Sequence, residues 1–153
     1  MITYRKATLP DAQALARIRC TFLMEANDLS SEAQLAEMEP MLLAYFTTTL
    51  ADGSFVAWLA LDGDAIVATS GLSFSLVPPS YSNKSGKAAY IINMYTRPEY
   101  RRRGIAAALL KRTIEEAKTR GYSKITLHAT DMGRPLYETF GFSGVPEFME
   151  LQA

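Results

Sequence analysis

Residues 88–110 join an apolar run to a basic turn and then to a helical pattern, and this segment constrains the fold most strongly. The run up to Thr96 is rich in β-branched and aromatic residues, which favours a buried strand, and Pro98 ends it. From Ile105 onward the apolar positions repeat at the spacing of one helix face. The turn between strand and helix predicts an anion-binding site, because the first N–H groups of a helix lack partners within it and lie at the positive end of its dipole.

The turn itself contains three arginines and a glycine, Arg101, Arg102, Arg103 and Gly104. Glycine has no Cβ, so an anion can approach the backbone closely there. The pattern is not a nucleotide-triphosphate loop or a dinucleotide fingerprint, because the further glycines and the Lys-Ser/Thr pair are missing. By itself the turn predicts phosphate binding, and a solvated helix start explains it equally well.

Length and composition predict one soluble domain over residues 1–153, since 48% hydrophobic residues are enough for one sizeable core. The 16 basic residues balance 16 acidic ones, so we expect no nucleic acid or anionic membrane as a partner. One Cys and one His give neither a disulfide nor a metal-binding spacing. Without a signal-like start or an apolar run near the ~18 residues of a membrane span, we expect a cytoplasmic protein.

Alternation and turn signals predict the strands of a mixed α/β sheet. The expected strands are residues 1–6, 54–61, 65–76, 88–96, 124–129 and 147–151. The second and third form a hairpin with Asp62 and Gly63 in the turn. The later strand, helix and strand need a parallel pairing with a right-handed crossover.

Capping signals predict four helices. They follow a start signal at 8–11, a capping box of Ser31 and Gln34, the basic turn, and a cap at Asp131. Pro40 falls inside the second, where it removes a backbone donor, so we expect a kink or two short helices meeting at Glu39. Residues 78–86 have the composition of a mobile loop, which could serve as a lid.

A second motif, Leu-Tyr-Glu-Thr-Phe-Gly-Phe at residues 136–142, follows about thirty residues after the basic turn. Together the two motifs resemble the GNAT superfamily of acyl-CoA-dependent N-acyltransferases, in which an Arg/Gln-x-x-Gly-x-Gly/Ala turn precedes a Leu-Tyr-x-x-x-Gly-Phe element. The resemblance covers most of the chain in the family's order. It implies an α/β (α+β) fold with a mixed, mostly antiparallel sheet of six to seven strands, a central parallel pair that splays apart, and about four flanking helices.

The resemblance implies acetyl-CoA as the cosubstrate, bound around the turn and the strand before it. The residues implied in binding are Met94, Tyr95, Thr96, Arg101, Arg102, Arg103, Gly104, Ile105, Ala106, Ala107, Thr130 and Gly133. In the family the turn's backbone holds the pyrophosphate, the strand backbone pairs with the pantetheine arm, and an N–H near Met94 or Tyr95 polarises the thioester carbonyl. Thr130 and Gly133 replace the Asn and the Ala or Ser that many members have.

Tyr137 is implied as the acid that protonates the departing thiolate. An attacking amine with a pKa near ~10 must also lose a proton, and the candidates for this base are Asp131, His128 and Glu25. Asn93 stands where some members have a carboxylate base.

The acceptor implied is a primary amine, either a small molecule or a peptide or protein, attacking directly in a ternary complex without a metal. The family binds it against the first two helices and the 77–87 loop, where Glu25, Asp28 and Tyr81 are candidates together with Asn93. A homodimer is left open. The alternatives are a non-catalytic acyl-CoA-binding or regulatory module of this fold and a nucleotide-binding protein.

Overall fold

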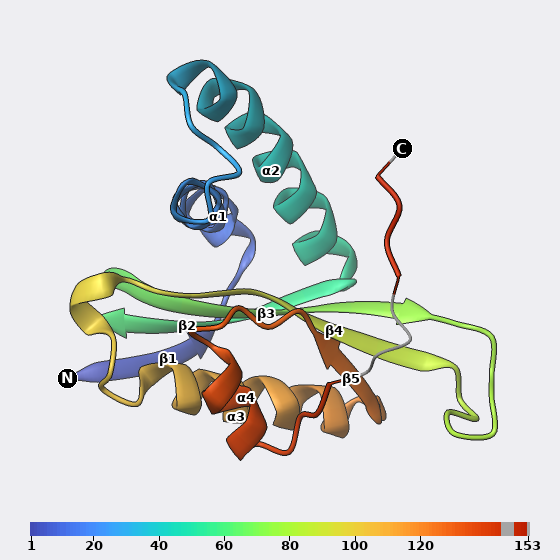
Figure 1. Ribbon diagram of the computed structural model, residues 1–153. Helices are drawn as coiled ribbons and strands as arrows, with labels where there is room; N and C mark the ends of the chain where they lie inside the picture. Colours follow the sequence, from blue (N-terminus) through green and yellow to red (C-terminus); the bar gives the residue numbers. More distant parts are fainter. Residues whose placement is uncertain (145–148, 153) are drawn as a thin grey trace.

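A computed structural model describes residues 1–144 and 149–152, and they form one sheet with helices on both faces (Figure 1). The strands are β1 (Ile2–Lys6), β2 (Phe55–Asp62), β3 (Ala65–Leu76), β4 (Lys87–Thr96) and β5 (Lys124–Leu127). The helices are α1 (Ala12–Glu25), α2 (Glu32–Asp52), α3 (Ile105–Thr119) and α4 (Arg134–Thr139), with short 3-10 turns at Leu9–Asp11 and Pro98–Tyr100. No helix in these residues is long and apolar enough to cross a membrane.

The sheet order is β1-β2-β3-β4-β5, antiparallel except for the parallel pair β4 and β5. Helix α3 makes the crossover between the parallel strands, as the sequence predicts. Six to seven strands with a central parallel pair were expected, whereas the described residues form five strands and the parallel pair lies at the sheet edge. The predicted strand at 147–151 falls partly outside the described residues, and its described part, 149–151, forms no strand.

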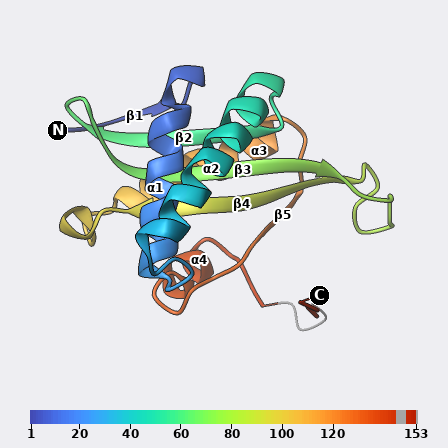
Figure 2. The ribbon, with the colours of Figure 1, turned by 90° about the horizontal axis from the view of Figure 1, so that it is seen from above.

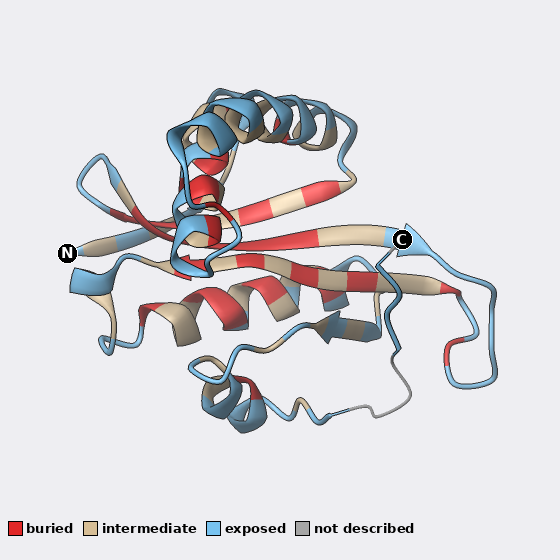
Figure 3. Cartoon of the chain, turned by 45° about the horizontal axis from the view of Figure 1, so that its top comes forward, coloured by how far each residue is buried: buried red, intermediate tan, exposed pale blue. Residues whose placement is uncertain are grey.

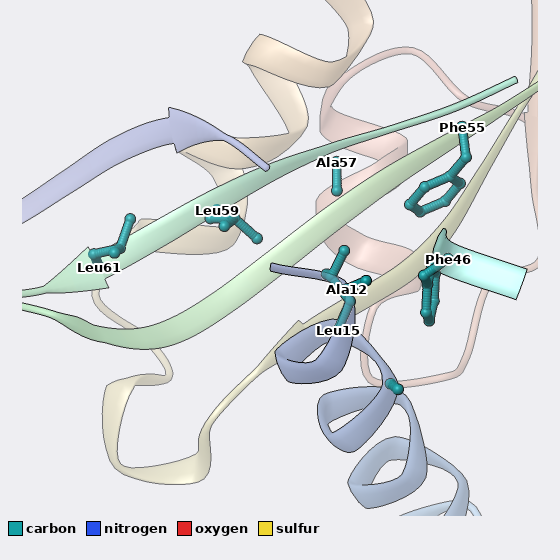
Figure 4. Packing of buried hydrophobic residues seen from close by; sticks show 8 residues of the cluster. Ala12, Leu15, Phe46, Phe55, Ala57, Leu59 and Leu61 are labelled. Carbon is teal, nitrogen blue, oxygen red and sulfur yellow. The ribbon is translucent and has the colours of Figure 1, made fainter. Parts of the chain in front are cut away.

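Helices α1 and α2 cover one face of the sheet and α3 and α4 the other (Figures 1 and 2). Figure 3 shows buried positions concentrated on the strands and on the helix sides that face them. Figure 4 shows the core under α1 and α2, in which Leu15 and Phe46 pack with Phe55 and Leu59. Each such side chain stabilises the fold by about 1.5–3 kcal/mol when fully buried.

Helix α2 is one continuous helix through Pro40, so the expectation of two short helices is wrong. Ser31 caps it by accepting a hydrogen bond from the Gln34 N–H at 3.2 Å, as predicted. Apolar residues on both sides of Pro40, Leu35 and Leu42 among them, pack against the end of α1. This packing offsets the single hydrogen bond that proline removes.

Two turns differ from the sequence prediction by one or two residues. Asp62 pairs with Ala65, so the hairpin turn consists of Gly63 and Asp64. Gly133 and not Asp131 stands at the N-cap position of α4. In the turn before the helix the Thr130 hydroxyl accepts a hydrogen bond from the Gly133 N–H at 3.1 Å.

The 77–86 loop lies at the end of β3 and β4 opposite the basic turn (Figures 1 and 2). It folds back on itself through a bridge between Ser80 and Asn83. Asn83 is buried and donates to the Lys87 carbonyl at 3.1 Å. The loop is therefore held by hydrogen bonds of its own.

Candidate active site

A β-bulge interrupts β4 near its middle. Thr69 pairs with Tyr95 and Gly71 with Ile92, so Asn93 and Met94 together lie opposite one residue of β3. Asn93 adopts a φ of 61°, a conformation that Asn tolerates better than most residues. Because of the bulge, Ile92 packs under α1 and α2 while Met94 packs under α3, although residues two apart normally share a face.

The Asn93 side chain is buried, at 4% exposure, and neither its amide nitrogen nor its amide oxygen has a partner among the described residues. Its backbone carbonyl accepts a hydrogen bond from the Thr69 hydroxyl at 2.7 Å, which holds the bulge. An unpaired buried amide costs about 1–3 kcal/mol. A polar ligand that reached the bulge would remove this cost.

Strands β4 and β5 separate just before the bulge. Their pairing runs from Ala88 with Lys124 to Ile91 with Leu127, where β5 ends, while β4 continues to Thr96. Beyond Ile91 the outer edge of β4 therefore has no strand partner in the described part of the chain. Its backbone groups are open to an extended ligand there.

Tyr137 of α4 lies on the α3 side of this gap. It is 9% exposed and belongs to the same apolar cluster as Met94 and Leu110. Burial raises the pKa of Tyr137, and its hydroxyl has no hydrogen-bond partner among the residues described. A Cβ on Gly133 would come within 3.0 Å of the ring, so Gly133 gives the tyrosine room.

The basic turn brings the N-terminus of α3 to the end of β4. Gly104 has a φ of 78°, which only glycine adopts at no cost, and Arg102 has a φ of 62°. No side chain caps α3 and its first turn holds no acidic residue. The first N–H groups of the helix, at Ile105, Ala106 and Ala107, are therefore available to an anion.

The arginines of the turn have different roles. Arg101 donates from Nε to the Thr96 carbonyl at 2.8 Å, which closes the turn. Its Nη2 lies 3.0 Å from a Glu25 carboxylate oxygen. Arg103 instead lies over the Tyr100 ring, at 5.1 Å from its centroid.

Glu25 also accepts a hydrogen bond from the Tyr95 hydroxyl at 2.8 Å. Burial, followed by this hydrogen bond, raises the pKa of Tyr95 to about 12. Both oxygens of the Glu25 carboxylate are thus engaged, one by Tyr95 and one by Arg101. Beside them is a cavity of about 400 Å³ that Arg17 and Arg97 also line.

The remaining candidate residues lie apart from one another. Asp28 is in the connection between α1 and α2, and Asp131 is exposed in the turn before α4. Tyr81 is 91% exposed on the loop at the far end of β4. His128 follows β5 and is hydrogen-bonded to Tyr90 of β4. No role was assigned to Tyr90 from the sequence, although its alternation with the buried Ala89 and Ile91 indicates that it lies on the opposite face of the strand.

The comparison with protein families agrees with this geometry, since the model of the acetyltransferase (GNAT) family matches residues 18–142. The chain belongs to this family. The resemblance found in the two motifs and the mixed, mostly antiparallel fold are thereby confirmed. Among the residues that the structure describes, no three His, Cys, Asp or Glu residues come together in a group that could hold a metal ion.

A solved structure similar along its whole length is a predicted acetyltransferase with acetyl-CoA from Clostridium acetobutylicum. It is 38% identical, with a TM-score of 0.91, over 99% of this chain and 96% of that chain.

Two curated relatives match over shorter stretches. The uncharacterized N-acetyltransferase YsnE of Bacillus subtilis is 31% identical over 98 residues, 61% of this chain and 59% of that protein. Thialysine N-epsilon-acetyltransferase of Bos taurus is 29% identical over 73 residues, 48% of this chain and 43% of that protein. The chain thus spans about half the length of these curated relatives.

Proposed function

We propose that this protein transfers an acetyl group from acetyl-CoA to a primary amine, by direct attack in a ternary complex. The observation that carries the proposal is the buried, unpaired Asn93 amide at a bulge where β4 loses its partner strand. A buried polar group without a partner is costly, and such costs concentrate at functional sites. The Clostridium structure with acetyl-CoA supports the choice of cosubstrate.

The residues around the gap fit acetyl-CoA. We assign the pyrophosphate to the backbone from Arg103 to Ala106, where Gly104 has open space in place of a side chain. We assign the pantetheine arm to the β4 edge at Met94 and Thr96, beyond the end of β5. Gly133 at the start of α4 lies close to both the Thr130 hydroxyl and the Tyr137 ring, so these residues are next to the proposed acid.

The reaction needs one group that polarises the acetyl carbonyl and one that protonates the leaving thiolate. We assign the first role to the Met94 N–H at the bulge. The amine nitrogen then bonds to the carbonyl carbon, the C–S bond breaks, and the electron pair goes to sulfur. Tyr137 gives its proton to that sulfur, a transfer that is uphill by ~2 kcal/mol at the reference pKa values of ~10 for a phenol and ~8.5 for a thiol. The proton that the amine nitrogen loses as the amide forms restores the Tyr137 hydroxyl. Burial raises the pKa of Tyr137, so it carries this proton at neutral pH.

The acceptor proposed is a small primary amine. One relative is named for acetylating thialysine, whose acceptor is such an amine. Glu39 on α2 is paired with Arg17 at 3.1 Å, and Glu25 at the end of α1 is paired with Arg101 at 3.0 Å. Asp28 makes no ion pair with a described residue and is the carboxylate that we assign to the ammonium group.

The test is thiol release from acetyl-CoA across a panel of primary amines and lysine peptides. We expect turnover on at least one small amine. Tight acetyl-CoA binding without turnover on any of them would establish a binding or regulatory module instead. If ATP or NAD protects the fold from heat and CoA does not, the protein binds nucleotides.

A further inference from the structure

Tyr90 and His128 meet across the parallel strands where the pairing of β4 with β5 ends. The Tyr90 hydroxyl is hydrogen-bonded to Nδ1 of His128, and the ring centroids are 5.4 Å apart at 73°. Tyr90 pairs with Thr126 in the register of the two strands, and His128 directly follows Leu127, where β5 ends. Tyr90 is half-buried and His128 is exposed, so the pair connects the interior with solvent.

This pair and Tyr137 lie on opposite faces of the sheet. Ile91 and Leu127 pack in the cluster of Tyr137, under α3 and α4. Their neighbours Tyr90 and His128 alternate to the other face, and Tyr90 is accordingly within electrostatic reach of Arg19 on α1. A thioester in the gap would thus have the tyrosine acid on one side and this pair on the other.

The other candidate bases are less well placed for an amine that approaches from the α1 side. Both Glu25 oxygens are engaged by Tyr95 and Arg101. Asp131 lies in the turn that leads into α4, the helix of Tyr137. Asn93 is an amide and has no basic group.

We propose that Tyr90 and His128 together accept the proton of the attacking amine, an inference that rests on the acetyltransferase function proposed above. The ammonium proton passes to the Tyr90 oxygen as the Tyr90 proton passes to His128 Nδ1, which requires the tautomer with hydrogen on Nε2. The amine is left neutral and attacks the thioester. The imidazolium returns its proton to solvent, so the cycle releases one proton for each acetyl group transferred.

The surroundings of Tyr90 favour its neutral hydroxyl, the form that the proton relay requires. Burial raises the pKa of Tyr90, and the Arg19 charge opposes this only in part. Arg19 itself faces Asp28 and Tyr45, whereas Ser73 and Thr126, the strand neighbours of Tyr90, carry no charge. About 10 Å of strand separates Tyr90 from the bulge at Asn93, a distance that a tyrosine side chain and one water can span.

The test compares Tyr90→Phe and His128→Gln with the wild type from pH 6 to pH 10, on an amine that the wild type acetylates. At pH 7 we expect kcat/KM for the amine to fall by about 100-fold in both variants. The difference should shrink toward pH 10, where about half of an amine of pKa ~10 is already neutral, and the dissociation constant for acetyl-CoA should stay the same. Tyr122→Phe, which removes the hydroxyl of a tyrosine stacked on Phe74, is the matched control and should match the wild type.

A loss below threefold, or an equal loss at every pH, overturns this assignment. So does a loss in only one of the two variants, because the relay needs both groups. These outcomes are distinct from failure of the proposed function, in which the wild type itself would acetylate no amine. Since the chain has one histidine, diethylpyrocarbonate gives a second measurement: modification of His128 should abolish turnover while acetyl-CoA still binds.

Discussion

Arg101 Nη2 lies 3.0 Å from the Glu25 carboxylate and so joins the basic turn to the C-terminal end of α1, although the two residues are 76 positions apart. The same carboxylate holds the Tyr95 hydroxyl on β4. Glu25 thus connects the proposed coenzyme turn with the helices that we assign to the acceptor. The link suggests that the two halves of the site are positioned together.

Replacement of Glu25 by Gln should weaken acetyl-CoA binding by about 5- to 10-fold, because Arg101 loses its ionic partner and the turn loosens. The loss of a charged hydrogen bond should also lower the free energy of unfolding by about 1–2 kcal/mol. Titration calorimetry and urea unfolding measure the two effects. Glu99→Gln removes an exposed carboxylate of the same turn and should change neither quantity. Equal effects in both variants would show that the effects come from the net charge near the turn and not from the contact between Glu25 and Arg101.

The stability of the fold should fall at high pH through Tyr95. Its pKa in the folded state, about 12, lies above the ~10 of an unfolded tyrosine, so the neutral hydroxyl stabilises the fold below pH ~10. This contribution, at most about 3 kcal/mol, should be lost as the pH rises from 10 to 12. Urea unfolding at several pH values should therefore show a flatter decline for Tyr95→Phe than for the wild type. Parallel declines would contradict the raised pKa.

Gly104→Ala should weaken acetyl-CoA binding by tenfold or more, because alanine disfavours a φ of 78° and the turn must change shape. Gly53→Ala is a matched control: its φ is 80°, a Cβ there also meets nothing within 4 Å, and it caps α2. Both variants should lose about 1–2 kcal/mol of stability. Acetyl-CoA affinity should fall only in the first, and affinity that falls equally in both would remove the pyrophosphate from the turn.

Asn93→Gly should separate stability from function. Glycine adopts the φ of 61° readily and removes the buried, unpaired amide, so the free protein should be no less stable than the wild type. Thiol-release assays should show at least tenfold lower kcat/KM if the amide contacts the acyl group or the amine. A variant that is clearly less stable would mean that the amide has a partner in the fold.

Tyr137→Phe should lower kcat by about 100-fold while the dissociation constant for acetyl-CoA changes by less than threefold, because only the proton for the thiolate is lost. The ring still packs against Phe142, at 6.1 Å between centroids, so the fold should keep its melting temperature. Stopped assays of thiol release and equilibrium binding measure the two constants. Wild-type turnover in this variant would exclude Tyr137 from the mechanism.

The amino-acid sequence by itself determined the local features of this protein. The strand at Lys87–Thr96, the basic turn and the helix at Ile105–Thr119 follow from periodicity, proline and glycine over a few neighbouring residues. The cap at Ser31 and the family resemblance are likewise local, since they depend on short motifs.

Only the tertiary structure decided how distant segments meet. The bulge at Asn93 depends on register with β3, and the contacts of Glu25 with Arg101 and of Tyr90 with His128 join residues 76 and 38 positions apart. Such contacts are set by packing and pairing across the whole sheet, which no local pattern records. The turn therefore predicted an anion site from the sequence alone, and the family resemblance named Tyr137 as the acid and His128 among the candidate bases. Only the fold showed that Tyr90 contacts His128.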